Sequence, residues 1–126
     1  MKRRVLVVDD DINLSRLSAA ILENSERYET MTVNDSARAI AAAIQFQPDA
    51  ILLDVDMPGL SGGDIARCAA ENAKLRAIPI LFLTGLLTHE ETAAGPVESA
   101  GQQFLAKPVD PEELLACIDA LLPQAA

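Results

Sequence analysis

An α/β fold with a parallel sheet covered by helices on both sides is the architecture that the sequence predicts. Short apolar runs alternate with helical periods along the whole chain, and the runs Val5–Val8 and Ala50–Leu53 contain no polar residue. Such unbroken apolar runs are typical of parallel strands buried on both faces. The 126 residues suffice for one compact domain, so a single domain over 1–126 is expected.

Periodicity and turn residues place the elements along the chain. Strands are expected over residues 5–8, 28–33, 50–53, 79–84 and 103–106, and helices over 12–24, 36–45, 64–75, 88–100 and after 110. Repeated strand–helix units give parallel strands joined by right-handed crossovers. The helix over 88–100 is expected to be short, kinked or split at Gly95-Pro96, because proline removes a helical hydrogen bond.

Helix ends and faces carry more specific signals. Asp110 is a natural N-cap for the last helix, Pro111 suits its first position, and Glu113 can complete a capping box. Asp11 and Asp64 are expected to cap the first and third helices. Helical spacing assigns a buried face to Leu14, Leu17 and Ile21 in the first helix, and to Ile65, Cys68 and Leu75 in the third.

The composition excludes several classes of protein. A formal charge of −9 argues against direct nucleic-acid binding, which normally uses a basic face. The apolar runs are too short to cross a bilayer and the amino terminus lacks a long apolar stretch, so a cytoplasmic location away from membranes is expected. Cys68 and Cys117 lie far apart without metal-ligand spacing, and both are expected in the core.

The residues that end the predicted strands are the candidates for chemistry, because functional groups of open α/β sheets gather at the carboxyl ends of the strands. Those residues are Asp9 and Asp10 after the first strand, Asp54 after the third, Thr84 at the end of the fourth and Lys107 after the fifth. The second strand ends at Asn34, for which no role is expected. Three carboxylates, a hydroxyl and an ammonium group should therefore converge on one edge of the sheet.

This combination suits phosphoryl transfer. Clustered carboxylates repel one another unless a cation lies among them, and ligation by oxygen alone favours Mg²⁺. Asp54 would attack phosphorus and form an acyl phosphate. Lys107 and Thr84 would bind the remaining phosphoryl oxygens by charge and hydrogen bond.

Four segments resemble the receiver domains of response regulators in two-component phosphorelay systems: VLVVDD (5–10), ILLDVDMPGLSG (51–62), PILFLT (79–84) and FLAKP (104–108). They occur in the family's order and cover nearly the whole chain. The resemblance implies a flavodoxin-like three-layer sandwich, with a five-stranded parallel sheet of order 2-1-3-4-5 and five helices. It also implies a signalling switch that catalyses only its own phosphorylation and dephosphorylation, with a histidine kinase or histidine phosphotransfer protein as donor.

The resemblance assigns phosphoryl and metal roles by position. Asp54 matches the phosphoacceptor, and Asp10 and Asp54 match ligands of Mg²⁺, for which Mn²⁺ is a candidate substitute. Asp9 would bind the metal through water or hydrogen bonds, and the backbone carbonyl of Asp56 would complete the protein ligands. The role of the Asp56 side chain stays open.

Further positions match switching and structural residues of the family. Thr84 and Phe104 match the hydroxyl and aromatic switch residues, with a simple core position as the alternative for Phe104. Lys107 matches the invariant lysine, and its bond to Pro108 matches a peptide bond that is typically cis and would help to aim the lysine. Gly62 is expected to serve the tight turn after the third strand.

Two other functions share parts of this pattern. A haloacid-dehalogenase-type phosphatase would use Asp54 as nucleophile and Asp56 as general acid/base, but it leaves Asp9 and Asp10 without a task. An unphosphorylated interaction module should lack an acceptor-site residue, and none is missing. The downstream partner is not predicted, and a homodimer through the face made by 88–100, 103–106 and the last helix stays open.

Overall fold

The computed structural model of this chain describes residues 2–55, 57, 59, 61–85, 97–99, 102–107 and 109–122, with 97–99 and 102 described by their backbone alone. Its strands are β1 (Arg3–Val8), β2 (Tyr28–Val33), β3 (Ala50–Asp54), β4 (Ile80–Thr84), β5 (Val97–Ser99) and β6 (Gln102–Ala106). Its helices are α1 (Ile12–Asn24), the short 3₁₀ helix η1 (Ser36–Arg38), α2 (Ala39–Phe46), α3 (Gly62–Ala70) and α5 (Pro111–Leu121).

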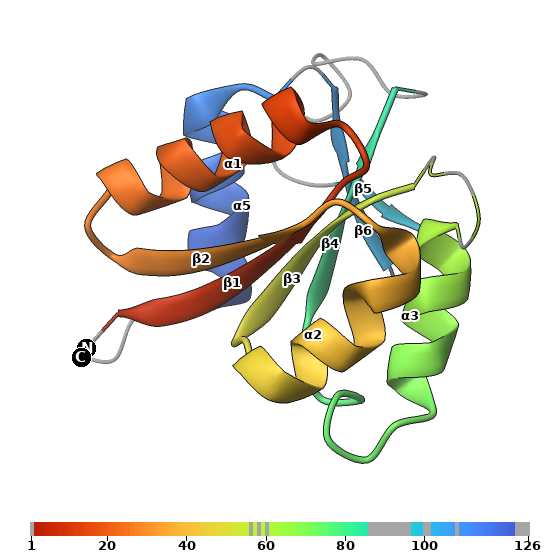
Figure 1. The fold of residues 1–126 in the computed structure, drawn as a ribbon. Helices are drawn as coiled ribbons and strands as arrows, with labels where there is room; N and C mark the ends of the chain where they lie inside the picture. The colour runs from red at the N-terminus through yellow and green to blue at the C-terminus, as the bar shows by residue number, and fades with distance from the viewer. Residues whose placement is uncertain are drawn as a thin grey trace.

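The sheet has the order β2-β1-β3-β4-β6-β5 (Figure 1). Its five parallel strands confirm the predicted order 2-1-3-4-5, with β6 as the fifth strand in that count. A short antiparallel strand, β5, is added at the edge beside β6. Since β5 covers Val97–Ser99, the helix expected over 88–100 does not extend through these residues. The break expected at Gly95-Pro96 lies outside the described residues.

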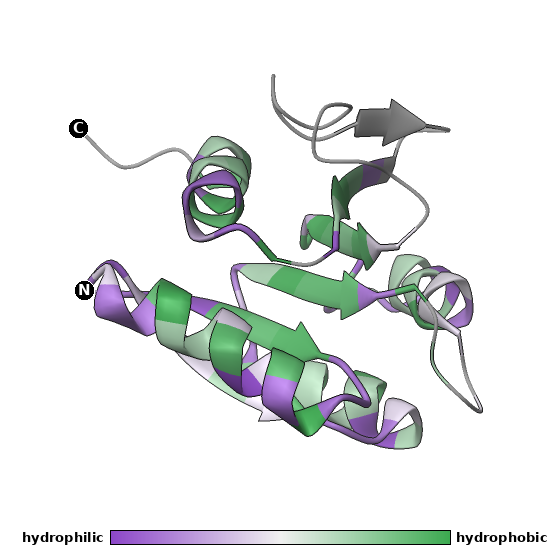
Figure 2. Ribbon diagram, turned by 90° about the horizontal axis from the view of Figure 1, so that it is seen from above, coloured by the Kyte–Doolittle hydropathy of each residue, from purple (hydrophilic) through white to green (hydrophobic). Residues whose placement is uncertain are grey.

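Two hydrophobic clusters hold the layers together. Helices α1 and α5 lie on one side of the sheet, and α2 and α3 lie on the other (Figure 1). Alternate strand residues supply the two clusters: Val5, Leu52 and Leu81 pack with α5, and Leu6, Ile51 and Phe82 pack with α2 and α3. Figure 2 shows the hydrophobic colour along the central strands, as expected for strands covered on both faces. None of the described helices is long and apolar enough to cross a membrane.

The buried face of α1 differs from the predicted one. Its buried residues are Ser15, Ser18, Ala19 and Leu22, whereas Leu17 is 48% exposed. Leu14 and Ile21 only flank the core, so the helix is rotated by about one residue from the expected stripe. Small side chains of α1 form the centre of its buried face; of the three predicted residues, Leu14 and Ile21 pack against the core and only Leu17 is exposed.

The third helix is shorter than predicted, and Cys68 is on its exposed side. Helix α3 ends at Ala70. Leu75 is buried, but it belongs to the segment after the helix and so is not part of the buried face of α3. The face that α3 buries carries Ile65, Ala66 and Ala69. Cys68 is therefore exposed, contrary to the prediction, while Cys117 is buried in the core as expected.

Side-chain caps fix where the helices begin. Asp11 caps α1 by accepting a hydrogen bond from the amide of Leu14 at 3.1 Å, as predicted. Asp110 caps α5 in the same way. In α3 the N-cap is Ser61, and Asp64 acts as its capping-box partner three residues later rather than as the N-cap.

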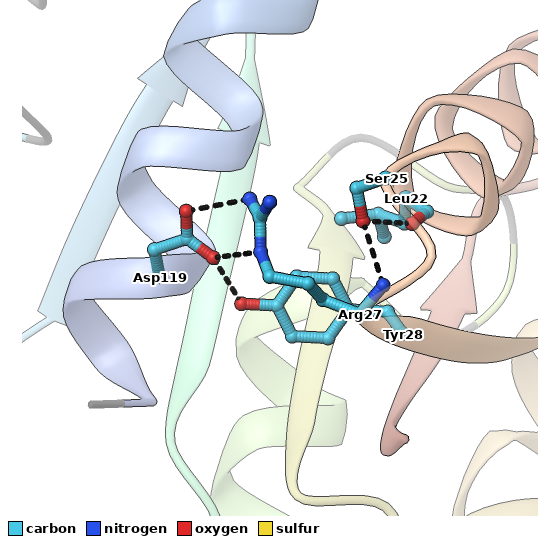
Figure 3. Close-up of polar contacts among 5 residues, drawn as sticks. All are labelled: Leu22, Ser25, Arg27, Tyr28 and Asp119. Atoms are coloured by element: carbon cyan, nitrogen blue, oxygen red, sulfur yellow. Dashed lines mark hydrogen bonds and ion pairs between the residues drawn. The ribbon is translucent and has the colours of Figure 1, made fainter. Parts of the chain in front are cut away.

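A polar clamp joins the start of β2 to α5 (Figure 3). The hydroxyl of Tyr28, a fully buried residue, donates a hydrogen bond to Asp119. The guanidinium of Arg27 also binds that carboxylate, with Nη2 at 2.8 Å from Oδ2. Burial raises the pKa of Tyr28 from its ordinary 10.0 to about 12, and the bond to Asp119 adds to this effect.

Because Tyr28 is the only tyrosine, its titration can be followed by ultraviolet absorbance of the whole chain. We expect a midpoint near pH 12 in the unmodified chain and a lower one, still above 10.0, in Asp119→Ala, because burial is the larger cause. A folded-state pKa above the unfolded value means that this stabilisation is complete below pH 10.0 and is lost as pH rises through about 12. Glu112→Ala, an exposed change on α5, is the control; an equal shift in both variants would contradict the assignment.

Candidate functional site

Three carboxylates meet where β1 and β3 end. These strands are neighbours, with Val8 paired to Leu53, so the residues after them lie side by side. One carboxylate oxygen from each of Asp9, Asp10 and Asp54 lies within 4.8 Å of the other two. Asp9 and Asp54 are each 2% exposed, whereas Asp10 is open to solvent. The structure thus brings together three of the acids that the sequence analysis selected.

Lys107 reaches this pocket from the end of β6. Its backbone amide donates to the carbonyl of Thr84 at 2.8 Å, which holds the start of the β6–α5 segment against β4. Its ammonium Nζ lies 2.6 Å from Oδ1 of Asp54, and the pair is largely buried. A charge-assisted bond of this length marks Asp54 as the carboxylate that the lysine contacts directly.

The pocket holds more negative than positive charge. Burial raises the pKa of the Asp9 carboxyl from 3.8 to about 6. The amide of Asp11, which donates to Oδ1 of Asp9 at 2.9 Å, opposes this effect. The charge of Asp54 raises the pKa of Asp9 further, while Lys107 lowers it. One ammonium group therefore does not compensate three carboxylates.

The donor set fits a hard divalent cation. Oδ2 of Asp9 is buried and has no hydrogen-bond partner among the residues that the structure describes. A buried carboxylate oxygen without a partner is costly unless a cation takes that place. Since every converging ligand atom is an oxygen, the pocket matches the preference of Mg²⁺. Asp56, whose carbonyl was expected to contribute, lies outside the described residues.

Thr84 and Phe104 lie on one face of the sheet. Thr84 ends β4 and is 4% exposed. Phe104 pairs with Phe82 across β4 and β6, and their rings stack with centroids 5.1 Å apart. Because side chains alternate along a strand, Phe82 and Thr84 point to the same side, which also carries α2 and α3. Phe104 is therefore half-buried against the core.

Gly62 allows α3 to begin directly against the end of β3. Its amide donates to the carbonyl of Val55 at 3.1 Å. A Cβ at this position would lie 2.6 Å from the backbone oxygen of Asp54, closer than such atoms approach. Any larger residue would thus move the backbone that carries Asp54. The bond between Lys107 and Pro108 lies outside the described residues.

Asn34, for which the sequence predicted no role, contacts the site. Its Nδ2 donates to the backbone carbonyl of Asp9 and to Oγ of Ser15, both at 2.8 Å. The signal that could have indicated this is Ser15, a hydroxyl residue on the buried face of α1. A buried serine needs a hydrogen-bond partner, and Ser15 finds one in Asn34.

These features define a class of protein: a parallel α/β domain with an acidic pocket and a lysine at the carboxyl ends of its strands. The sequence profile of the response regulator receiver domain matches residues 5–119. The chain therefore belongs to the receiver-domain family of response regulators. This family consists of signalling switches whose standard reaction is phosphorylation by a histidine kinase, and its members bind Mg²⁺ at their acidic pocket.

Individual relatives support this membership. The chain is 33% identical over 122 residues to the DNA-binding response regulator MtrA of Mycobacterium tuberculosis, and 38% identical over 122 residues to the response regulator PleD of Caulobacter vibrioides. These matches cover 97% and 96% of this chain but only 51% and 26% of those proteins. The chain thus spans about half, or less, of the length of these relatives.

Solved receiver structures share the fold. The chemotaxis response regulator CheY4 of Vibrio cholerae is 30% identical, with a TM-score of 0.81 over 97% of this chain and 100% of that one. The receiver domain of the sensor histidine kinase PA1611 from Pseudomonas aeruginosa is 27% identical, with a TM-score of 0.81 over 98% of this chain and 100% of that one. That structure contains a magnesium ion coordinated in its active-site cleft.

Proposed function

We propose that this chain is a phosphorylation switch in which Asp54 accepts a phosphoryl group, with Mg²⁺ held by the acidic pocket. The observation that carries the proposal is the contact between Oδ1 of Asp54 and Nζ of Lys107 at 2.6 Å, beside the carboxylates of Asp9 and Asp10. The donor is a histidine kinase or a histidine phosphotransfer protein, as in the family. A cytoplasmic location and a single domain over residues 1–126 remain predictions.

The reaction uses residues with distinct tasks. A carboxylate oxygen of Asp54 attacks phosphorus, and a P–O bond forms as the P–N bond of a phosphohistidine donor breaks. The electron pair of the broken bond leaves with the imidazole nitrogen. The ammonium of Lys107 pairs with a phosphoryl oxygen, and the hydroxyl of Thr84 donates to another.

A cation would be held by the carboxylates of Asp10 and Asp54, with Asp9 binding directly or through water and Asp56 contributing its backbone carbonyl. When bound, Mg²⁺ would neutralise charge on the phosphoryl oxygens. The orphaned Oδ2 of Asp9 and the oxygen-only donor set support this assignment. Mn²⁺ has the same preference for carboxylate oxygens and is proposed as a substitute.

Phosphorylation is proposed to change the positions of Thr84 and Phe104. Phe104 stacks on Phe82, two residues before Thr84 on β4, so a displacement of Thr84 can reach the aromatic pair through one strand. This would shift a two-state equilibrium and alter the face that includes β6 and α5. A downstream partner, a tethered effector or a homodimer would bind there.

The test is labelling of the purified chain by acetyl phosphate, followed by intact-protein mass spectrometry. We expect one phosphoryl group per chain with Mg²⁺ or Mn²⁺, and little or none with EDTA. Equal labelling with EDTA would contradict the metal requirement. Absence of label under every condition would favour the unphosphorylated interaction module.

The same samples distinguish the phosphatase alternative. A haloacid-dehalogenase-type enzyme would turn over p-nitrophenyl phosphate many times, with Asp56 as its general acid/base. That mechanism gives no task to Asp9 and Asp10, although both lie within 4.8 Å of Asp54. We therefore expect no sustained release of p-nitrophenol.

A further inference from the structure

Hydrogen bonds of Asn34 and Ser15 form a polar bridge that connects the acidic loop, residues 9–12, to the end of β2. Asn34 follows β2, and its Nδ2 donates two hydrogen bonds of 2.8 Å, one to the carbonyl oxygen of Asp9 and one to Oγ of Ser15. The side-chain amide nitrogen of Asn34 carries two hydrogens, and each of them is used in one of these bonds. The bridge therefore joins the end of β2, the end of β1 and the first turn of α1.

Ser15 continues the bridge to the other end of the loop. It is 1% exposed, and its hydroxyl donates to the carbonyl of Ile12 at 2.9 Å while accepting from Asn34. The carbonyls of Asp9 and Ile12 are thus held by a single hydrogen-bonded chain. Between them lie Asp10 and Asp11.

The backbone of this loop determines where two metal-ligand candidates point. Oδ1 of Asp9 accepts from the amide of Asp11 at 2.9 Å, whereas Oδ2 of Asp9 remains buried without a partner among the described residues. Asp10 and Asp9 both approach Asp54, although the three charges repel one another. An outward relaxation of the loop would relieve that repulsion and disperse the ligands.

We infer that Asn34 and Ser15 are positioning residues that hold the loop 9–12 in its cation-binding geometry against the repulsion of its own carboxylates. This inference rests on the proposed function. Neither side chain is a proposed ligand of the cation or of the phosphoryl group, and both act through the backbone of Asp9 and Ile12. Loss of such an outer partner lowers metal affinity by roughly 10–100-fold in known metal sites.

The test is a calorimetric titration of the full chain with MgCl₂. We expect Asn34→Ala to raise the Mg²⁺ dissociation constant on the order of tenfold. Ser15→Ala should act in the same direction but less, because the bond from Asn34 to Asp9 remains. The matched control is Asn13→Ala, an exposed change in the first turn of α1, for which no change is expected. Circular dichroism checks that each variant is folded at the temperature used.

A second readout separates positioning from a general loss of structure. In Asn34→Ala the Mg²⁺ concentration for half-maximal acetyl phosphate labelling should rise, while the rate at saturating Mg²⁺ should recover to the unmodified value. A lower maximal rate with an unchanged Mg²⁺ requirement would overturn the inference, as would a dissociation constant equal to that of Asn13→Ala. If the unmodified chain neither binds Mg²⁺ nor takes label, the proposed function fails first and the positioning role fails with it.

Discussion

Asp54→Ala is expected to abolish labelling by acetyl phosphate in the presence of Mg²⁺. Asp54 is the carboxylate that Lys107 contacts, at 2.6 Å, and the substitution removes the proposed nucleophile, which is also a proposed ligand of the cation. Among the described residues, the ammonium of Lys107 makes a hydrogen bond and an ion pair with the carboxylate of Asp54. Intact-protein mass spectrometry before and after incubation measures the loss.

The matched control for this prediction is Asp49→Ala. Asp49 directly precedes β3 and Asp54 ends it, so the two residues share a strand but lie roughly 17 Å apart. The Asp49 carboxylate accepts a hydrogen bond from the amide of Arg4 at 2.8 Å, at the opposite edge of the sheet. We expect this variant to be labelled like the unmodified chain. Label that persists in Asp54→Ala would contradict the assignment of the phosphoacceptor.

Asp9→Asn is expected to stabilise the metal-free protein while it weakens Mg²⁺ binding. The pKa of the buried Asp9 carboxyl is raised from 3.8 to about 6, so its ionisation opposes folding. We expect the free energy of unfolding of Asp9→Asn at pH 8 to exceed that of the unmodified chain by roughly 1–2 kcal/mol. This free-energy difference is smaller than the full pKa shift of Asp9 implies, because water at the opening of the pocket screens part of the repulsion between the carboxylates.

The pH dependence gives the sign of the effect. In the unmodified chain the protonated Asp9 carboxyl favours folding below pH 3.8, and this contribution is lost as pH rises through about 6. The advantage of Asp9→Asn should therefore disappear as pH falls from 8 toward 4. Urea unfolding in EDTA measures it, and Glu23→Gln, an exposed change on α1, is the control. A stability difference that does not vary with pH would contradict the electrostatic explanation.

The same substitution should lower the response to the metal. The unmodified chain is expected to gain stability from added Mg²⁺, because a ligand that binds only the folded state stabilises it. Asp9→Asn replaces an anionic oxygen donor with a neutral amide, so this gain should be much smaller. If both halves of the prediction hold, the pocket retains its acids for cation binding at a cost in stability.

Local patterns predicted the strands well, since their information is contained in consecutive residues. Tyr28–Val33 was predicted with both of its ends as observed, and the apolar run Ala50–Leu53 is buried throughout. The sequence also selected Asp9, Asp10, Asp54 and Lys107, because parallel strands present their ends at a common edge. Rotation of a helix about its axis was harder to predict, as Leu17 and Cys68 on exposed faces demonstrate.

By itself the sequence determined the α/β class, the strand order implied by the family resemblance, and the acidic edge where the candidate residues meet. Only the tertiary structure decided which face of α1 is buried, that Asn34 contacts Asp9 and Ser15, and that Tyr28 is bound to Asp119, 91 residues away along the chain. The physical reason is the range of the interactions. Strand and cap patterns arise between neighbours in sequence, whereas partners for buried polar groups are found only when distant segments pack together.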